Sequence, residues 1–280
     1  MHFRKGGNAG AKWHFPGCLQ GVMVPAMSIT LASISRYPVK GLAPDAMAHA
    51  LLAVDDGLPF DRRWAIAHAT SAADPGNPVW LPKSNFLNLA KDEKLAQLGA
   101  SFDEATRMLT LLRKGKQVAR GRLDDMTGRA LLVQFLSAFM GEGPRGRLRI
   151  VEAPAEASLT DVEPNWLSII NLASVTDIER VARQPIQPQR FRGNLLIDGA
   201  DPWVERDWVG KRIRIGDAVV EGMQIIGRCA ATEVNPETAE RDINLPLTLR
   251  RGYGHYHCGL YVRVVEPGEI ATGAPVEVLG

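Results

Sequence analysis

The sequence predicts a mainly β protein with a few helices, and three observations lead to this prediction. From Ile29 onward, short segments of alternating apolar and polar residues are separated by turns rich in glycine and proline, which is the pattern of half-buried strands. Helical periodicity is confined to two segments. The 280 residues, 45% hydrophobic and 23% charged, suffice for one or two cores. This composition excludes a disordered, collagen-like or coiled-coil protein.

The expected strands follow one another along the chain with turns between them. The segment 29–34 alternates and ends before Pro38, because proline cannot donate to a ladder. Gly115 marks a turn that joins 108–112 and 117–121 into a hairpin. The other segments expected to form strands are 50–54, 63–67, 195–197, 212–215, 219–226, 259–265 and 276–279.

Two helices are expected. Between Thr127 and Met140, apolar residues recur at i,i+4 spacing, which indicates a helix with one broad buried face. Ser174 stands three residues before Asp177, a capping-box pattern that predicts the start of a second helix. This second helix is expected to end before Pro185, since proline cannot continue it.

Two domains are expected after an N-terminal extension. Residues 1–26, which include Cys18, are interrupted by polar residues and proline, so they fit a disordered extension better than a signal peptide. The domains are expected at 28–125 and 126–280. The break in the pattern at 141–146 lies close to this division.

Charge and cysteine content limit the possible partners. Lys and Arg number 33 against 31 Asp and Glu, and the two signs are interspersed, which argues against a nucleic-acid-binding surface. No apolar run is long enough to cross a membrane. Three cysteines are too few for a disulfide framework, an iron–sulfur cluster or an all-cysteine zinc site. We therefore expect a reducing, cytoplasmic location.

Cys229 stands at the end of a predicted strand, directly after Arg228. A thiolate beside a cation is suited to act as a nucleophile or as a ligand for a soft metal. The alternative is a small buried apolar residue, which is the more frequent role of a free cysteine. The residues alone leave both roles open.

His255, His257 and Cys258 form a tight cluster. In a strand, the two histidines share one face and Cys258 points to the other, so all three reach one zinc ion only if the strand bends. The pattern favours the alternative, in which the histidines lie at the surface or at the rim of a pocket.

Three basic clusters would form a phosphate-binding site if the fold brought them together. They contain Lys40, then Arg62 and Arg63, and then Arg190, Arg192 and Asn194. Lysine offers a point charge and arginine a planar fork, and both suit phosphate oxygens. The expected helix start at Ser174 adds free amides that favour an anion. Taken singly, each cluster is better explained as a solvated charge or, for Arg62, as an ion pair with Asp61.

Taken in order, the motifs resemble those of the MOSC family, named for the C-terminal region of molybdenum cofactor sulfurase. The earlier motifs, Tyr37-Pro38-Val39-Lys40 and Asp61-Arg62-Arg63-Trp64, resemble the family's N-terminal β-barrel domain. The later ones, Phe191-Arg192-Gly193-Asn194-Leu195, Gly227-Arg228-Cys229 and Asn235-Pro236-Glu237-Thr238, resemble the MOSC domain itself. The members with a known activity include the amidoxime-reducing components. The resemblance covers about 28–280 and implies two β-barrel domains with a cofactor cleft between them.

The resemblance also implies roles for individual residues. Cys229 matches the cysteine whose sulfur ligates molybdenum, and a soft thiolate suits that metal, so it is the expected metal ligand and catalytic residue. The residues expected to bind the cofactor are Lys40, Arg62, Ser174, Arg192, Asn194 and Arg228. Asp198 and His255 are the candidates for acid–base chemistry on the substrate side.

At three positions the chain departs from the family pattern with a glycine. Gly41 stands where relatives often have serine, Gly193 where they have proline, and Gly227 where they have serine. Each glycine leaves room for the backbone and removes a side-chain contact.

The resemblance implies a molybdenum-cofactor-dependent oxidoreductase that removes oxygen from N-hydroxylated substrates such as amidoximes. The chain lacks the cysteines of a ferredoxin domain, so the electrons are expected from a separate partner of the ferredoxin or flavoprotein type. One alternative is a carrier of molybdenum cofactor or of sulfur, held as a persulfide on Cys229, and another is a module that has lost its cofactor. The family is also linked with pyridoxal phosphate, but no recognisable Schiff-base lysine motif is present.

Overall fold

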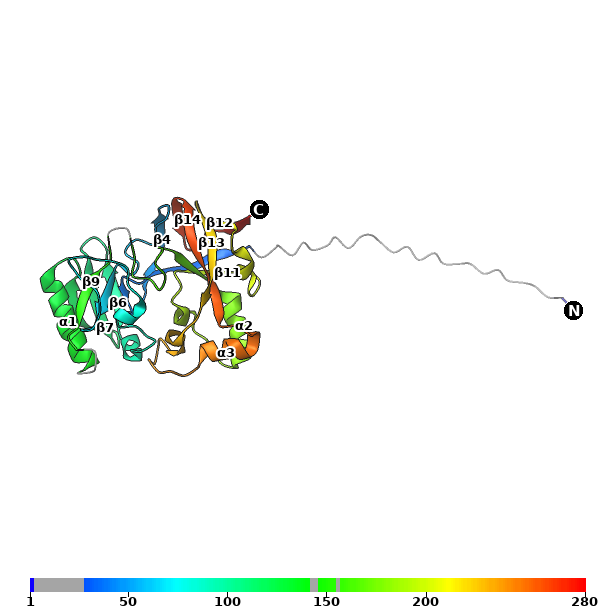
Figure 1. The fold of residues 1–280 in the computed structure, drawn as a ribbon. Coiled ribbons are helices and arrows are strands. Elements are labelled where there is room, and N and C mark those ends of the chain that lie inside the picture. Colours follow the sequence, from blue (N-terminus) through cyan, green and yellow to red (C-terminus); the bar gives the residue numbers. More distant parts are fainter. Residues whose placement is uncertain (3–27, 142–145, 155–156) are drawn as a thin grey trace.

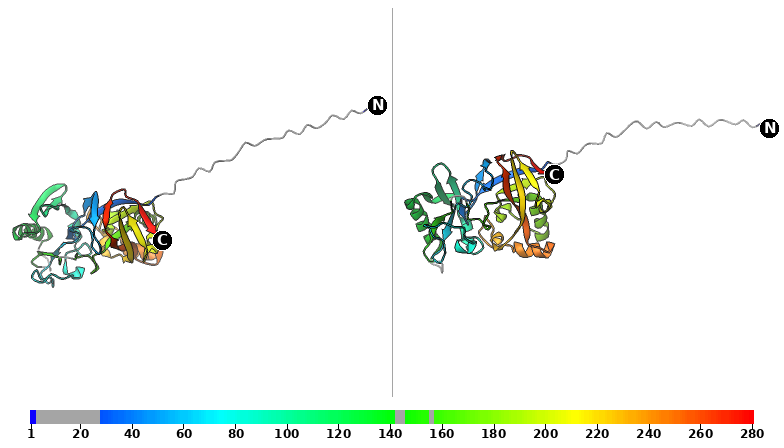
Figure 2. Two further views of the ribbon diagram at one scale, coloured as in Figure 1. Left: turned by 90° about the horizontal axis from the view of Figure 1, so that it is seen from above. Right: turned by 45° about the horizontal axis from the view of Figure 1, so that its top comes forward.

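The computed structural model describes residues 1–2, 28–141, 146–154 and 157–280. These residues form a mainly β protein with three α-helices, which confirms the predicted fold class. Two bodies lie side by side in all three ribbon views (Figures 1 and 2). The expected extension at 1–26, with Cys18, falls outside the described residues except for Met1 and His2.

The first body, which we call the N-terminal body, consists of two three-stranded sheets and one helix. Its sheets are β2 (Val39–Lys40), β5 (Trp64–Ala67) and β9 (Arg149–Glu152), and β6 (Gly99–Asp103), β7 (Met108–Arg113) and β8 (Lys116–Arg122). Helix α1 (Met126–Met140) begins where the Asp125 carboxylate accepts a hydrogen bond from the Gly128 amide at 2.6 Å. It buries Leu132, Leu136 and Phe139 in the core of this body, on the face that the i,i+4 spacing predicts.

The second body, which we call the sheet body, is built on an eight-stranded sheet. Its strands, in spatial order, are β16 (Val276–Leu279), β12 (Arg212–Ile215), β13 (Ala218–Gly227), β14 (His257–Glu266), β10 (Leu167–Asn171), β11 (Leu195–Asp198), β1 (Thr30–Arg36) and β3 (Asp45–Met47). Only the pair β10 and β11 is parallel among these neighbours. The sheet is curled and buries apolar residues such as Leu31, Val220 and Val262 on one face.

Helices α2 (Leu172–Ala182) and α3 (Leu245–Tyr253) cover the opposite face of this sheet. They pack on Ile170 and Cys258, whereas Ile169, which precedes Ile170, is buried on the other face because side chains alternate along a strand. The expected start of α2 at Ser174 is wrong: Asn171 caps the helix and accepts a hydrogen bond from the Ala173 amide at 3.0 Å. Helix α3 was not expected from the sequence.

The chain crosses between the bodies more than once. Strands β1 and β3 precede most of the N-terminal body in sequence but lie in the sheet body, and β4 (His49–Leu52) pairs with β15 (Gly268–Ala271). In the other direction, α1 and β9 belong to the N-terminal body, because β9 pairs with β5 and α1 packs in its core. The expected division between residues 125 and 126 therefore does not coincide with the change of body, since strand pairing does not follow chain order.

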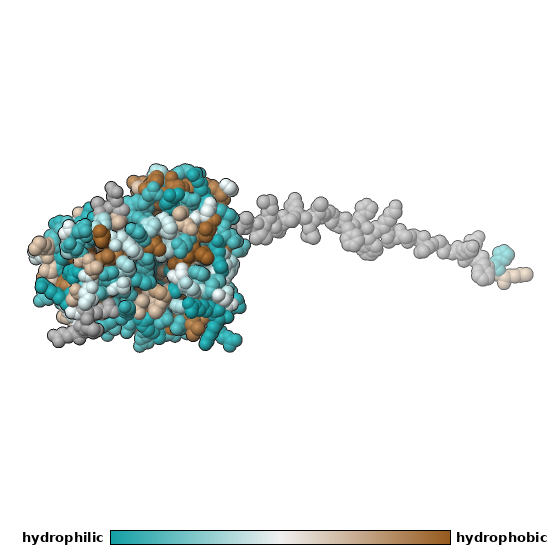
Figure 3. Space-filling model, in the orientation of Figure 1, coloured by the Kyte–Doolittle hydropathy of each residue, from teal (hydrophilic) through white to brown (hydrophobic). Residues whose placement is uncertain are grey.

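Figure 3 shows hydrophilic residues over most of one face of both bodies, with hydrophobic residues in separate patches, at the upper edge and across the middle of this face. In the part of the chain that the structure describes, the longest helix has 15 residues, and none has both the length and the apolar character needed to cross a bilayer.

Candidate functional site

A cavity of about 300 Å³ lies between the two bodies, at the lower end of the usual size of small-molecule sites. The N-terminal body and the loop after β9 supply Lys40, Gly41, Arg62, Lys83, Asn88 and Asp161, and the sheet body supplies Ser168, Arg190, Arg192, Asn194, Arg228, Cys229 and Tyr261. Every residue expected to bind the metal or the cofactor lines this one cavity, except Ser174. Segments more than one hundred residues apart in sequence therefore meet here.

Cys229 lies where β13 ends, directly before a short 3₁₀ helix (Ala230–Glu233). Its carbonyl oxygen accepts hydrogen bonds from the amide and the hydroxyl of Thr232, at 3.0 and 2.9 Å, which fix the turn. The side chain is half-buried and lines the cavity, whereas Cys258 is buried among apolar residues. Burial raises the pKa of the Cys258 thiol to about 12. Of the two, Cys258 has the role of a small apolar residue and Cys229 has an accessible sulfur.

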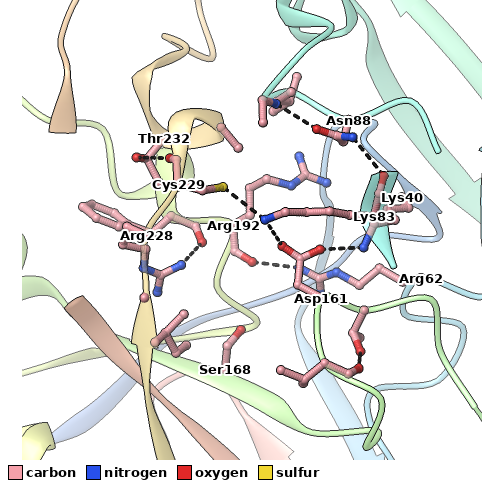
Figure 4. A pocket seen from close by; sticks show the side chains of 18 of the residues that line it. Lys40, Arg62, Lys83, Asn88, Asp161, Ser168, Arg192, Arg228, Cys229 and Thr232 are labelled. Atoms are coloured by element: carbon pink, nitrogen blue, oxygen red, sulfur yellow. Dashed lines mark hydrogen bonds and ion pairs between the residues drawn. The ribbon is translucent and has the colours of Figure 1, made fainter. Parts of the chain in front are cut away.

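A row of polar side chains runs from Cys229 into the N-terminal body (Figure 4). The Lys83 ammonium donates to Cys229 Sγ at 3.4 Å and to Asp161 Oδ2 at 3.2 Å. The other oxygen of Asp161 accepts from Lys40 Nζ at 2.6 Å. Lys40 also donates to the carbonyl of Leu159 at 2.7 Å. The carboxylate of Asp161 therefore accepts hydrogen bonds from two ammonium groups, and one of these, that of Lys83, also contacts the thiol.

The charges in this row shift one another's protonation. Burial alone would raise the pKa of Asp161, but the ammonium groups of Lys40 and Lys83 hold it well below its usual range. Burial lowers the pKa of Lys40, although Asp161 opposes the shift. For Lys83, burial acts downward, and Asp161 and Cys229 together outweigh it and raise the pKa. The row thus keeps Asp161 ionised at neutral pH.

Two arginines lie against the ring of Tyr37. The guanidinium carbons of Arg62 and Arg192 lie 4.4 and 4.3 Å from the ring centroid, a distance typical of cation–π contacts. Arg62 is neutralised by Asp61, at 2.5 Å, and donates to the carbonyl of Arg192 at 2.9 Å. The guanidinium of Arg192, by contrast, has no hydrogen-bond acceptor among the residues that the structure describes. Burial lowers the pKa of Arg192 to about 10, so it remains charged at neutral pH.

Arg228 and Asn194 line the cavity, but most of their polar atoms are used to hold the scaffold. Arg228 donates to the carbonyls of Cys258, at 2.7 and 2.5 Å, and of Phe191, at 2.9 Å. The side-chain oxygen of Asn194 accepts hydrogen bonds from the backbone N–H and the hydroxyl of Ser168. Its side-chain NH₂ donates to the carbonyl of Ser35 at 3.2 Å. Both side chains therefore position the strand ends that carry Cys229 and Arg192.

Ser174 does not belong to the cavity. Its hydroxyl is fully buried, lies 2.9 Å from both carboxylate oxygens of Glu205 and accepts from the Trp203 amide at 2.7 Å. A carboxylate beside the hydroxyl would repel a phosphate, so the expected phosphate contact at Ser174 is wrong. The capping-box pattern misled the prediction because Asn171, three residues earlier, begins the helix.

The other candidates for substrate chemistry also lie outside the cavity. Asp198 is exposed at the end of β11 and accepts from the Gly199 amide at 2.8 Å. His255 packs against the rings of Trp203 and Tyr253, which also contact each other, and it contacts Arg206. Within the described ranges, no group of three or more His, Cys, Asp and Glu residues could hold a metal ion. The cluster at 255–258 is therefore not a metal site of this kind.

Two of the glycines that depart from the family pattern are explained by their neighbours. Gly41 has a φ of +89°, and a Cβ there would lie 2.8 Å from the carbonyl oxygen of Leu87. A Cβ at Gly193 would overlap the fully buried side chain of Ile170. A larger residue at either position would displace the backbone beside Lys40 or Arg192.

Lys83 and Asp161 were missed by the sequence analysis. Lys83 begins a short 3₁₀ helix (Lys83–Asn85), and Asp161 lies in the loop between β9 and β10. Neither follows a strand-like or helical pattern, and Lys83 is 146 positions from the cysteine it contacts. Only the fact that Pro82 precedes Lys83 hinted at a fixed loop, which is a weak signal.

The lining residues together define a class of site. Six cationic side chains, of Lys40, Arg62, Lys83, Arg190, Arg192 and Arg228, face one lining carboxylate and one thiol. Cations of both kinds suit an anionic group, and an accessible thiol suits a soft metal. The fold and the cavity therefore define a β-rich protein whose cavity has a cationic lining and an accessible thiol, an arrangement that suits an anionic ligand.

Comparisons with known proteins agree with this class. The model of the MOSC domain matches residues 163–277. Human mitochondrial amidoxime-reducing component 1 is 27% identical over 124 residues, 40% of this chain and 36% of that protein. The molybdenum cofactor sulfurase of Drosophila mojavensis is 24% identical over 255 residues, 83% of this chain and 31% of that protein.

Among solved structures, the YuaD protein from Bacillus subtilis is 12% identical, with a TM-score of 0.41 over 90% of this chain and 96% of that one. The chain spans between about a third and a half of the length of the amidoxime-reducing relatives, and less than a third of the sulfurases.

Proposed function

We propose that the protein binds the molybdenum cofactor in this cavity and uses it to reduce N-hydroxylated substrates such as amidoximes. One observation carries the proposal: the thiol of Cys229 opens into the same cavity in which cations from both bodies converge. The similarity to amidoxime-reducing components and to molybdenum cofactor sulfurases supports the same conclusion.

The residues present fit such a cofactor. Its phosphate needs donors that are not already paired, and the charged guanidinium of Arg192 has no acceptor among the described residues. Lys40 uses two donors on Leu159 and Asp161, which leaves its third N–H available. The metal needs a soft ligand, and Cys229 is a free, accessible thiol.

The chain's own residues would bind and orient the cofactor. Cys229 would ligate the metal, and Lys40, Arg62 and Arg192 would hold the anionic end. Arg228 and Asn194 would keep the strand ends in place through their backbone contacts. When bound, the cofactor supplies two-electron redox chemistry that the side chains lack. An amidoxime thereby gains two electrons and two protons, loses its N–O oxygen as water and becomes an amidine.

We expect the electrons from a separate redox protein of the ferredoxin or flavoprotein type. Within these 280 residues there are three cysteines, fewer than the four thiolates that an iron–sulfur cluster takes. A reducing cytoplasm would keep Cys229 as a thiol, ready for a metal.

The proposal is tested by metal analysis, pterin fluorescence and an amidoxime-reduction assay with a reduced viologen as the electron donor. Wild type should contain about one molybdenum per chain and reduce benzamidoxime. Cys229→Ala should lose both molybdenum and activity. Cys258→Ala is the matched control, because it removes a thiol that does not line the cavity, and it should keep both.

The outcomes separate the proposal from its rivals. Molybdenum without reduction by the wild type would favour a carrier, and the sulfurase similarity over 83% of the chain is the observation that makes this second function worth testing. A persulfide on Cys229, detected by mass spectrometry, would favour a sulfur carrier. If the protein contains neither molybdenum nor pterin after expression with an ample molybdate supply, the result would favour a module that has lost its cofactor.

A further inference from the structure

Lys83 has no part in the cofactor binding proposed above, yet it is the charged group that contacts the sulfur. Its ammonium lies 3.4 Å from Cys229 Sγ, and its side chain is 40% exposed. A group that approaches the Cys229 end of the cavity therefore meets Lys83. In Figure 4, Lys83 stands between the thiol and Asp161, with Lys40 beyond the carboxylate.

The charge at this end of the cavity is not neutralised by the chain. Among the residues that the structure describes, Asp161 is the only carboxylate that lines the cavity, and it is shared by Lys83, at 3.2 Å, and Lys40, at 2.6 Å. Two ammonium groups and one carboxylate leave one positive charge. The carboxylate nearest to Arg62 is Asp61, which lies outside the cavity lining and pairs with that arginine instead.

We propose that Lys83 is a specificity-determining residue, whose ammonium attracts negatively charged groups to the Cys229 end of the cavity. With respect to the substrate, this inference rests on the proposed function. N-hydroxylated compounds that carry an anionic substituent, such as a carboxylate, would then be preferred over neutral ones, and cationic ones would be disfavoured.

Elementary electrostatics sets the size of the effect. Lys83 is partly exposed, so water and salt screen its charge, and the gain for an anion a few ångströms away is on the order of three- to tenfold. The same argument predicts that the gain becomes smaller as the ionic strength rises.

The effect of the Lys83 charge at Cys229 is measured in the protein without cofactor. For this, the rates at which two reagents of similar size alkylate Cys229 are compared. Iodoacetate is anionic and iodoacetamide is neutral, and both form an S–C bond to the same thiolate and release iodide. Both rates are proportional to the fraction of Cys229 present as thiolate, so this fraction drops out of their ratio. The ratio therefore reports the electrostatic potential at the thiol. A Cys18→Ser background removes the one cysteine outside the described residues, and Cys258 is buried.

Lys83→Gln should lower the iodoacetate-to-iodoacetamide ratio by on the order of three- to tenfold at low salt. Lys83→Arg should keep the ratio, because it keeps the charge. Lys116→Gln is the matched control: Lys116 is exposed on β8, outside the cavity lining, and its loss should leave the ratio unchanged. A ratio that stays the same in Lys83→Gln would overturn the inference.

The substrate preference is measured on the loaded enzyme with benzamidoxime and its para-carboxy and para-trimethylammonio derivatives. Wild type should show the highest kcat/KM for the carboxy compound and the lowest for the cationic one. In Lys83→Gln the differences in kcat/KM among the three compounds should become smaller. Lys83→Arg should keep them, because it keeps the charge.

The two measurements test the charge at Lys83 and the proposed reductase activity separately, so either proposal can be contradicted while the other stands. A reductase whose preference is the same in wild type and Lys83→Gln would overturn the substrate part and leave the proposed function intact. A ratio that falls in Lys83→Gln, in a protein that reduces no amidoxime, would support the charge at Lys83 and contradict the proposed reductase.

Discussion

The two sides of the cavity use their charges differently. On the N-terminal side, Lys40 and Lys83 are tied to Asp161, and Arg62 is tied to Asp61. On the side of the sheet body, Arg192 keeps a guanidinium without an acceptor among the described residues, and Cys229 offers a half-buried thiol. On the N-terminal side each of these cations has a carboxylate partner, although one positive charge remains because Lys40 and Lys83 share Asp161. On the side of the sheet body, Arg192 has no carboxylate partner among the described residues.

This difference shows that the number of cations at a cavity is a poor guide to the ligand's contacts. Arg228 lines the cavity as Arg192 does, but it donates its hydrogen bonds to the carbonyls of Cys258 and Phe191. A ligand would have to break those bonds to use it, which costs free energy. The donors without a partner are the better guide to where an anion binds.

The largest expected effect concerns the two cysteines of the sheet body. At about pH 8, a thiol with a pKa of about 12 is ionised in about one molecule in ten thousand. Cys258 should therefore resist iodoacetamide in the native protein, while Cys229 is labelled. Mass spectrometry of tryptic peptides measures both sites, and unfolding in urea should make Cys258 reactive. Equal labelling of the two in the native state would contradict the contrast between them.

A second prediction tests how rigid the N-terminal side is at Lys40. Gly41→Ala should lower the free energy of unfolding by about 3 kcal/mol, because the Cβ meets the Leu87 carbonyl and the positive φ is unfavourable for alanine. Urea unfolding followed by fluorescence measures the change. Gly210→Ala is the control, since Gly210 also has a positive φ but no atom within 4 Å of its Cβ, and it should lose only about 1 kcal/mol.

A third prediction removes the carboxylate that Lys40 and Lys83 share. Asp161→Asn should lower the free energy of unfolding by about 1–2 kcal/mol at neutral pH, a modest value because the Asp161 side chain is 45% exposed. The lowered pKa of Asp161 means that this stabilisation is present above about pH 4 and is lost as the pH falls below it.

Urea unfolding of wild type and Asp161→Asn from about pH 7 down to about pH 3 should therefore give curves that converge on acidification. A difference between the two proteins that stays constant over this range would show that Asp161 does not stabilise through its charge.

The smallest expected effect lies where the two sides meet. Arg241, in the loop before α3, donates to the carbonyls of Leu89 and Ala90, both at 3.0 Å, and to that of Ala230 at 2.9 Å. These contacts join the edges of the cavity beside Cys229. Arg241→Ala should cost less than about 1 kcal/mol in stability, since the side chain is 31% exposed.

The same variant should raise the rate at which iodoacetamide reacts with Cys229, by about twofold, because the edges of the cavity are no longer tied together. Arg214→Ala is the matched control, as Arg214 is exposed on β12. An unchanged rate in Arg241→Ala would mean that the contacts of Arg241 do not limit access to the thiol.

Sequence patterns were informative where a residue's role depends on its near neighbours in the chain. The strand β1, the hairpin of β7 and β8, and the buried face of α1 follow from alternation, turn residues and i,i+4 spacing. The position of Cys229 at a strand end was predicted for the same reason. The expected roles of Lys40, Arg62, Arg192, Asn194, Arg228 and Cys229 in cofactor binding remain predictions, although these residues line one cavity.

The remaining features depend on contacts between distant segments. The row from Cys229 through Lys83 to Asp161 joins three loops, and no local pattern fixes their relative positions. The hydroxyl of Ser174 is similar in sequence to a capping group, and only the fold shows that Glu205 occupies its surroundings. Strand β10 is buried throughout, so it lacks the alternation that marks a strand.

The pairing of β1 with β11 has a practical consequence for fragments of this protein. The match to the MOSC model begins at residue 163, yet the sheet continues beyond β11 into β1 and β3, which come from residues 30–47. A truncated polypeptide that starts near residue 163 would expose the unpaired backbone of β11 to solvent and to neighbouring molecules. Such a polypeptide is expected to aggregate, so we do not expect the region matched by the family model to fold on its own.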